Sequence, residues 1–188
     1  MPSIPERSRI GDASRRCLLV AAAIVVGMGC RASQITQIGT PERTSHTVRA
    51  LVFVPGSSLL AYSIGVEMTK RGYSVVDTRE ATALLAKHNV NPADLLTPLG
   101  LATLGKGGVD AVVSVSSTGS PMGGSAMRNV AVRVTSTRTS GMIGGLSWRN
   151  GSGGMPGSTA DLIMQKGLTE AANEIAEALA NQLAPAGR

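Results

Sequence analysis

The segment of this sequence that comes nearest to a motif for chemistry is Gly-Leu-Ala-Thr-Leu-Gly-Lys, from Gly100 to Lys106. A loop that cradles nucleotide phosphates needs two spaced glycines, a lysine, and then a serine or threonine whose hydroxyl binds Mg²⁺. Gly107 stands in the place of that hydroxyl residue, and no predicted strand leads into the segment. We therefore interpret it as the end of a helix, and we expect no nucleotide cofactor.

Histidines and carboxylates are equally poor candidates for catalysis or metal binding. His46 and His88 have no cysteine, histidine or carboxylate nearby at the spacing of metal ligands. Asp77 and Asp110 stand singly at the ends of predicted strands, where an aspartate commonly stabilises a turn or a helix start. The sequence also lacks a Gly-x-Ser-x-Gly nucleophile motif. These residues predict a protein with no catalytic site, no metal site and no cofactor.

Cys30 has the most specific chemistry that the sequence offers. It follows Arg15 and Arg16, an apolar run and several small residues, which is the order of a cleaved export signal. The apolar run is shorter than the roughly 20 residues that a membrane-spanning helix needs. A cysteine at the end of such a segment resembles the lipobox of bacterial lipoproteins, in which the thiol is acylated and becomes the first residue of the mature chain. Gly29 fits that motif, whereas Gly27 stands where a leucine, valine or isoleucine is usual.

Two other interpretations of this N-terminal segment remain open. One is an uncleaved membrane anchor, and the other is ordinary signal cleavage that leaves Cys30 as a free thiol. Residues 14–19 also match a twin-arginine export motif, although two arginines before an apolar run are common in ordinary signals. Cys17 and Cys30 are the only cysteines of the chain, so an acylated Cys30 would leave no pair for a structural disulfide.

The domain organisation follows from this segment. We expect a lipoprotein signal peptide at 1–29, a lipidated cysteine with a flexible tether at 30–48, one folded domain at 49–184 and a tail at 185–188. The net charge of the chain is +6, yet its basic residues are scattered and aromatic residues make up only 2% of it. Nucleic-acid-binding surfaces combine clustered lysine and arginine with stacking aromatics, so we expect no nucleic-acid partner.

Within the folded domain, apolar runs of strand type alternate with amphipathic segments of helical periodicity. The predicted strands are 50–54, 73–77, 109–116, 129–137 and 142–148, and the predicted helices are 59–71, 78–88, 93–104 and 158–183. This order, β-α-β-α-α-β-β-β-α, predicts an α/β (α+β) fold with a mixed sheet in two or three layers. The first strand–helix–strand unit predicts a parallel pair with a right-handed crossover.

Three stretches carry a resemblance to a known family. They are Gly72–Asp77, Gly108–Val113 and the hairpin from Val130 to Gly144, and the closing amphipathic helix follows them. Over residues 48–183 the chain resembles bacterial envelope proteins that include the curli-secretion lipoprotein CsgG, the penicillin-binding-protein activator LpoB and the amino-terminal domain of TolB. The resemblance implies an envelope protein that works by binding another protein, or a subunit of a secretion channel.

Trp148 is the only tryptophan, and it ends a predicted strand beside Arg149. Tryptophan and arginine are favoured at the centres of protein interfaces. Trp148, Arg149 and Arg133 on the adjacent strand are therefore the candidate partner-binding residues. The alternative for Trp148 is that it packs on the final helix.

The sequence thus predicts a lipid-anchored, non-catalytic cell-envelope protein that binds and regulates, or helps to assemble, another envelope complex. Its membrane contact would be the lipid on Cys30, its partner a second envelope protein, and formation of a homo-oligomer is open. Arg31 stands where an aspartate usually retains such lipoproteins in the inner membrane. This favours the periplasmic face of the outer membrane, with the inner membrane as the alternative. The alternative functions are a subunit of a secretion channel and, least favoured, a periplasmic enzyme.

Overall fold

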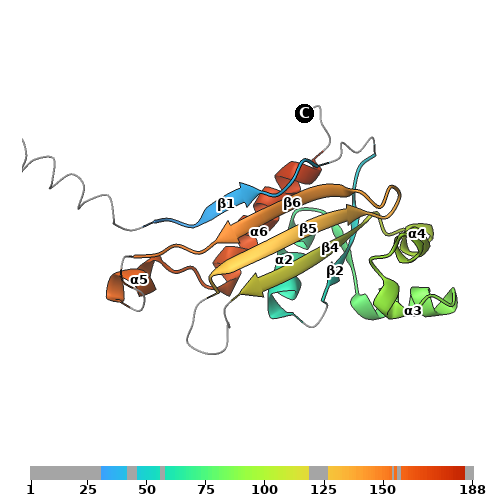
Figure 1. Ribbon diagram of the computed structural model, residues 1–188, viewed down its shortest axis with the longest axis horizontal. Coiled ribbons are helices and arrows are strands. Elements are labelled where there is room, and N and C mark those ends of the chain that lie inside the picture. Colours follow the sequence, from blue (N-terminus) through green and yellow to red (C-terminus); the bar gives the residue numbers. More distant parts are fainter. Residues whose placement is uncertain are drawn as a thin grey trace, which may run out of the picture.

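The computed structural model describes residues 31–41, 46–55, 58–118, 127–153, 155 and 158–184. Cys30, the predicted signal peptide at 1–29 and the predicted tail at 185–188 lie outside these residues. The described chain forms one six-stranded sheet with helices packed against it (Figure 1). In chain order the elements are β1 (Gln34–Gln37), β2 (Ala50–Val54), α2 (Leu59–Lys70), β3 (Ser74–Val76), α3 (Thr78–Lys87), the 3₁₀-helix η1 (Pro92–Asp94), α4 (Pro98–Lys106), β4 (Ala111–Thr118), β5 (Asn129–Ser136), β6 (Met142–Arg149), α5 (Thr159–Met164) and α6 (Leu168–Leu183).

The strands are arranged in the order β1-β6-β5-β4-β2-β3. β2 pairs in parallel with both β3 and β4, whereas the pairs β4–β5, β5–β6 and β6–β1 are antiparallel. The predicted mixed sheet and the predicted order of elements from β2 to α6 are confirmed, and β2, α2 and β3 form the predicted unit with a parallel strand pair. Gly72, which ends the turn after α2, has a φ of 88°, a conformation that glycine adopts at little cost.

β1 lies inside the predicted tether and corrects that prediction. The N–H of Arg31 donates to the C=O of Ser152 at 2.7 Å, and the N–H of Ser152 donates back to Arg31 at 2.9 Å. β1 then pairs with β6 along its whole length. The edge of β6 offers a row of backbone N–H and C=O groups, and a polar segment with four exposed residues satisfies them without burying any side chain. Residues 31–37 therefore belong to the folded domain.

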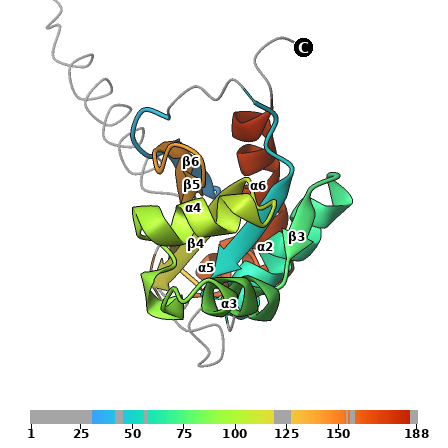
Figure 2. The same ribbon diagram turned by 90° about the vertical axis from the view of Figure 1, so that its right-hand side faces the viewer.

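Helices α2 and α6 cover one face of the sheet, and α3 and α4 cover part of the other. Successive strand residues point to opposite faces, so Leu51 of β2 enters the core beneath α2 and α6 with Ile64 and Leu146. The neighbouring Val52 enters a smaller core beneath α3 and α4 with Val112. Figure 2 shows α4 and α6 on opposite sides of β2. The molecule consequently has three layers beside β2.

Helix α4 reaches across to β4 and helps to bury Val112, but the second face of β5 and β6 carries no helix of the described chain (Figure 1). On β4, β5 and β6 the residues that alternate with the buried apolar ones point to this side. We call this surface the open sheet face and define it by Ser114, Ala131, Arg133, Ser147 and Arg149. Here the molecule has only two layers.

The predicted final helix at 158–183 is divided into α5 and α6, which is a further correction. Both backbone groups of Lys166 bind the side chain of Asn150: the N–H donates to Oδ1 at 2.8 Å, and the C=O accepts from Nδ2 at 3.1 Å. A residue held in this way has no backbone group left for a continuous helical ladder. α6 restarts behind Gly167, whose N–H donates to the carboxylate of Glu170 at 3.0 Å. The apolar spacing runs through the break and conceals it in the sequence.

Candidate protein-binding face and the contacts around Trp148

Trp148 lies on the side of β6 that faces α6, with 0% of its surface exposed. Its indole N–H donates a hydrogen bond of 2.8 Å to Oε2 of Glu174 on α6. A buried indole N–H needs such an acceptor, because an unpaired buried donor costs about 1–3 kcal/mol. Trp148 therefore packs on the final helix, the alternative that the sequence left open, and holds that helix on the sheet.

The carboxylate of Glu174 binds more than the indole. The hydroxyl of Ser33, just before β1, donates to Oε2 at 2.9 Å, and the ammonium of Lys166 forms an ion pair with Oε1. Burial by itself would raise the pKa of Glu174, but the hydrogen bonds from Lys166, Trp148 and Ser33 outweigh it and hold the pKa below its ordinary value. The charged carboxylate thus links α6 to β6, to the α5–α6 connection and to the chain just after Cys30.

Arg133 and Arg149 lie on the open sheet face, opposite to the side of Trp148. Both arginines are exposed, and Arg133 lies across from Gly145 in the β5–β6 pair. Because side chains alternate along a strand, neighbouring Trp148 and Arg149 must point to opposite faces. The predicted grouping of all these residues on one surface is therefore corrected: the structure brings Arg133 and Arg149 to one face and excludes Trp148 from it.

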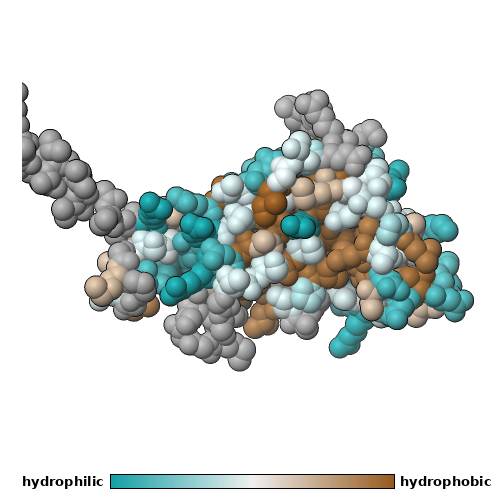
Figure 3. Space-filling model, in the orientation of Figure 1, coloured by the Kyte–Doolittle hydropathy of each residue, from teal (hydrophilic) through white to brown (hydrophobic). Residues whose placement is uncertain are grey.

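Small side chains surround Arg133 on the open sheet face. Gly145 has none, and a Cβ there would lie 3.2 Å from the C=O of Ile38 and 3.3 Å from the sulfur of Met142. Ile38 and Met142 therefore pack against β6 at the position where Gly145 has no side chain. Figure 3 shows apolar surface across the middle of this face. Among the ion pairs of the described residues none involves Arg133, so its guanidinium is available to an incoming acceptor.

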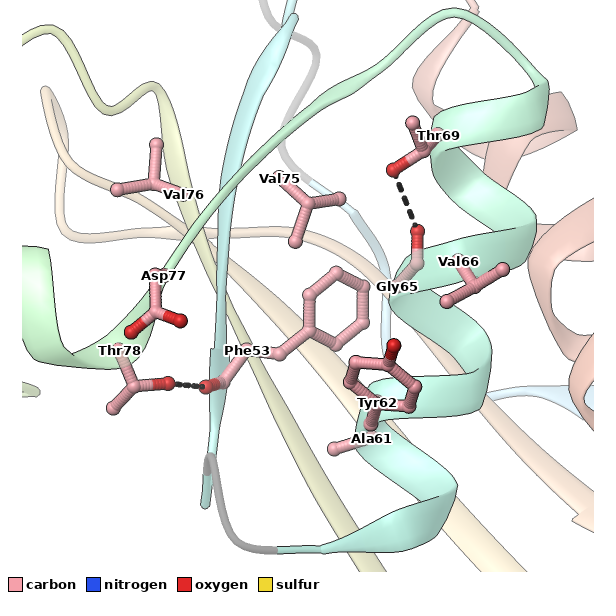
Figure 4. A pocket seen from close by; sticks show the side chains of 10 residues that line it. All are labelled: Phe53, Ala61, Tyr62, Gly65, Val66, Thr69, Val75, Val76, Asp77 and Thr78. Carbon is pink, nitrogen blue, oxygen red and sulfur yellow. Dashed lines mark hydrogen bonds between the residues drawn. The ribbon is translucent and has the colours of Figure 1, made fainter.

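A concave site that the sequence did not indicate lies between α2 and the edge strand β3 (Figure 4). It is a cavity of about 250 Å³ with Phe53 beside Tyr62 and Val66 of α2 and Val75 of β3. Asp77 is the carboxylate at its rim, and this side chain accepts from the backbone at the start of α3. The cavity offers an apolar recess with Asp77 as the one carboxylate among its lining residues.

The other residues singled out in the sequence have structural roles. The segment from Gly100 to Lys106 lies within α4, as predicted. Asp77 caps α3, and Asp110 accepts the backbone N–H groups of Arg49 and Ala50 at 2.9 and 3.0 Å. In the described part of the chain, no group of histidine, cysteine and carboxylate side chains is arranged to hold a metal ion. None of the helices built from those residues is long and apolar enough to cross a bilayer.

Sequence reasoning also missed the exposed apolar residues of α5. Leu162 and Ile163 are exposed on this helix, and Met155 is exposed in the loop before it. A signal was present, because Leu162 and Ile163 fall off the apolar stripe that the final helix buries.

Comparison with known proteins finds no matching family model and no matching curated protein. Among solved structures, the chain is similar to the PelC dodecamer from Paraburkholderia phytofirmans, with 12% identity, a TM-score of 0.46, and coverage of 81% of this chain and 99% of that chain. A second dodecamer structure, of a variant of the same PelC protein, matches with 10% identity and a TM-score of 0.47 over the same shares. Lipoprotein GNA1162 from Neisseria meningitidis matches with 18% identity and a TM-score of 0.41, over 74% of this chain and 99% of that one.

These similar structures thus include a bacterial lipoprotein. Likenesses at this level of identity and TM-score are no evidence of a shared function. The resemblance to the CsgG, LpoB and TolB proteins stays a prediction.

Proposed function

We propose that the protein is a lipid-anchored, non-catalytic cell-envelope protein that binds a second envelope protein through the open sheet face. The observation that carries the proposal is the contrast between the faces of β4, β5 and β6. One face is buried beneath α2 and α6, whereas the described chain leaves the other uncovered around Arg133. Uncovered surface of mixed apolar and small residues is typical of interaction sites, and an arginine within it supplies directional donors to a partner.

The N-terminal contacts support anchoring close to the membrane. Arg31 is bound to Ser152, and Ser33 is bound to Glu174. An acyl group on Cys30 would therefore hold the folded domain directly against the bilayer rather than at the end of a free tether.

Metabolic labelling with palmitate tests the anchor. The parent chain and Cys17→Ala are expected to take up label and to sediment with membranes, whereas Cys30→Ala is expected to take up none. Cys17 is the matched control because it is the other cysteine of the chain. Equal labelling of Cys30→Ala and the parent would refute lipidation at Cys30.

Photo-cross-linking in cell envelopes tests the binding face. A photoreactive residue at Ala131, on the open sheet face, is expected to give a discrete adduct, and one at Leu99 on α4 is expected to give none. Arg133→Glu should abolish the adduct, whereas Arg79→Glu, an equivalent charge reversal at an exposed position of α3, should leave it intact. An adduct that survives Arg133→Glu would contradict the proposal.

The mass of that adduct identifies the class of partner. An adduct with a different protein supports the regulator or assembly factor. An adduct of twice the chain mass means that the face joins copies of this chain, and the native mass in mild detergent then separates a dimer from a large ring. A ring would favour the alternative of a secretion-assembly subunit.

A further inference from the structure

Helix α5 exposes its apolar side chains and buries a carboxylate. Leu162 and Ile163 are 60% and 76% exposed, and Met155 in the preceding loop is 79% exposed. Asp161 is the buried residue of the helix: Oδ1 accepts from the N–H of Gly153 at 3.2 Å, and Oδ2 accepts from Gln165 at 2.8 Å. In a helix that faces water the reverse distribution is expected. The outward face of α5 is therefore suited to apolar surroundings.

Close packing holds α5 in this orientation. A Cβ on Gly153 would collide with the backbone of Ala160 and Asp161, and a Cβ on Gly151 would collide with the C=O groups of Met164 and Arg31. The glycine-containing segment is thus fitted between α5 and the first described residue of the chain. The exposed side chains of α5 are presented by a fixed support.

Arg31, the first described residue, lies at the same end as α5. Arg31 pairs with Ser152, in the segment that packs against α5, and Cys30 immediately precedes Arg31 in the sequence. In Figure 1, α5 and the start of β1 lie at one end of the long axis, whereas α3 and α4 lie at the other. Any attachment at Cys30 brings α5, and not α4, to the membrane.

Positive charge surrounds this end. Arg31, Arg128 and Arg149 are all exposed. Arg31 lies at this end because it pairs with Ser152. Arg128 and Arg149 lie there because the C=O of Arg128 accepts from the N–H of the residue after Arg149. Among nearby acids, Asp161 is buried and Glu174 is paired with a lysine, which leaves Glu170 exposed. Figure 3 shows hydrophilic surface gathered at this end. Apolar side chains beside basic ones fit the boundary between lipid headgroups and acyl chains.

We propose that this surface, the α5 end (Met155, Leu162 and Ile163 with Arg31, Arg128 and Arg149), contacts an anionic lipid bilayer. The apolar side chains enter the headgroup region and the arginines bind lipid phosphates. The proposal rests on the membrane attachment given under the proposed function. It adds a second contact that orients the domain, with the long axis of the sheet directed away from the bilayer. Arg149, at the edge of the open sheet face, then lies at the lipid surface, and the part of that face around Arg133 stays accessible from the side.

Fluorescence quenching on vesicles tests the proposal. Ile163→Cys and, as a matched control, Leu99→Cys are each made in the full chain carrying Cys17→Ser, and each is labelled with an environment-sensitive fluorophore. Leu99 is also an exposed apolar helix residue, and it lies at the opposite end of the molecule. The labelled chains are reconstituted into vesicles of phosphatidylglycerol and phosphatidylethanolamine that contain a nitroxide-labelled lipid, and iodide serves as the aqueous quencher. The fluorescence of Trp148 reports whether each variant is folded.

The label at position 163 is expected to be quenched several-fold more by the nitroxide lipid than the label at 99, and to be the less accessible to iodide. This difference should shrink in vesicles of neutral phosphatidylcholine, because the arginines then lose their anionic partner. Equal exposure of both labels to iodide would overturn the proposal. Protection of position 163 from both quenchers would also overturn it, because a second copy of the chain would then cover α5.

The chain with Cys17→Ser and no introduced cysteine separates failure of this proposal from failure of lipidation. It takes up no label if Cys30 is acylated. If it does take up label, Cys30 is a free thiol, and Cys30→Ser is added to both labelled chains, which are then mixed with the same vesicles. Lipid quenching at 163 alone still supports the contact, and lipid quenching at neither position refutes it.

Discussion

The indole N–H of Trp148 on β6 and the carboxylate of Glu174 on α6 are joined by a hydrogen bond of 2.8 Å. The same carboxylate binds the hydroxyl of Ser33 and the ammonium of Lys166. One acidic side chain therefore connects the sheet, the last helix, the α5–α6 connection and the chain next to Cys30. Stability, the position of α5 and the attachment of β1 are consequently expected to respond to the same residues.

Trp148→Ala is expected to lower the free energy of unfolding by about 3–5 kcal/mol, because it removes a large buried side chain and leaves a cavity. Arg149→Ala, the matched change at the next position, is expected to alter it by less than about 0.5 kcal/mol, because Arg149 is exposed. Denaturation followed by circular dichroism measures both values. Equal effects of the two substitutions would mean that Trp148 is not buried against α6.

The stabilising effect of Glu174 is expected to depend on pH. The pKa of Glu174 is lower in the folded protein than in the unfolded chain, so its contribution is complete above pH 4.5, the ordinary value for this group, and is lost as the pH falls through the folded pKa. Glu174→Gln should therefore lower Tm at pH 7, and the difference from the parent should fade in acid below the ordinary pKa. Glu177→Gln, at an exposed position of the same helix, controls for the loss of a charge. A difference that stays constant down to pH 3 would refute the charged role of Glu174.

Asn150→Asp is expected to destabilise the protein by at least about 2 kcal/mol. The Nδ2 group of Asn150 donates to the C=O groups of Met127 and Lys166 at 2.9 and 3.1 Å. A carboxylate has no hydrogen to donate to these carbonyl groups, so both lose a partner. Urea denaturation of Asn150→Asp and of Asn181→Asp, the same change at an exposed position of α6, measures the difference. Similar midpoints for both variants would contradict the assigned hydrogen bonds.

Ser33→Ala is expected to accelerate amide hydrogen exchange in β1 while changing Tm little. The hydroxyl of Ser33 holds the start of this edge strand to Glu174, and edge strands with few buried contacts open locally at low free energy. Gln34→Ala, in the same strand at an exposed side chain, should change exchange much less. Exchange in residues 31–37 at the rate of an unfolded peptide in the parent chain would instead restore the interpretation of this segment as a free tether.

Local patterns predicted most of the fold. The strand at 50–54, the helix ended by Gly72, the turn before Met142 and the order of elements from β2 onwards could be located in the sequence, because periodicity and turn residues act over a few neighbouring positions. The break between α5 and α6 could not be located, because it depends on the side chain of Asn150, which lies 16 positions before Lys166. The joining of residues 31–37 to the sheet could not be located either, because their polar composition matches both an exposed edge strand and a tether.

The candidate site divides in the same way. Arg133 was placed on the polar side by the alternation of its strand, whereas Arg149 was chosen only as the neighbour of Trp148. The packing of Trp148 on the final helix was one of two interpretations, and the outward face of α5 was not located. The sequence by itself determined which segments become strands and helices, since those preferences are local. Only the tertiary structure decided which face of β6 lies beneath α6 and which side of α5 meets solvent. Those outcomes depend on contacts such as that of Ser33 with Glu174, 141 positions apart, which no local pattern contains.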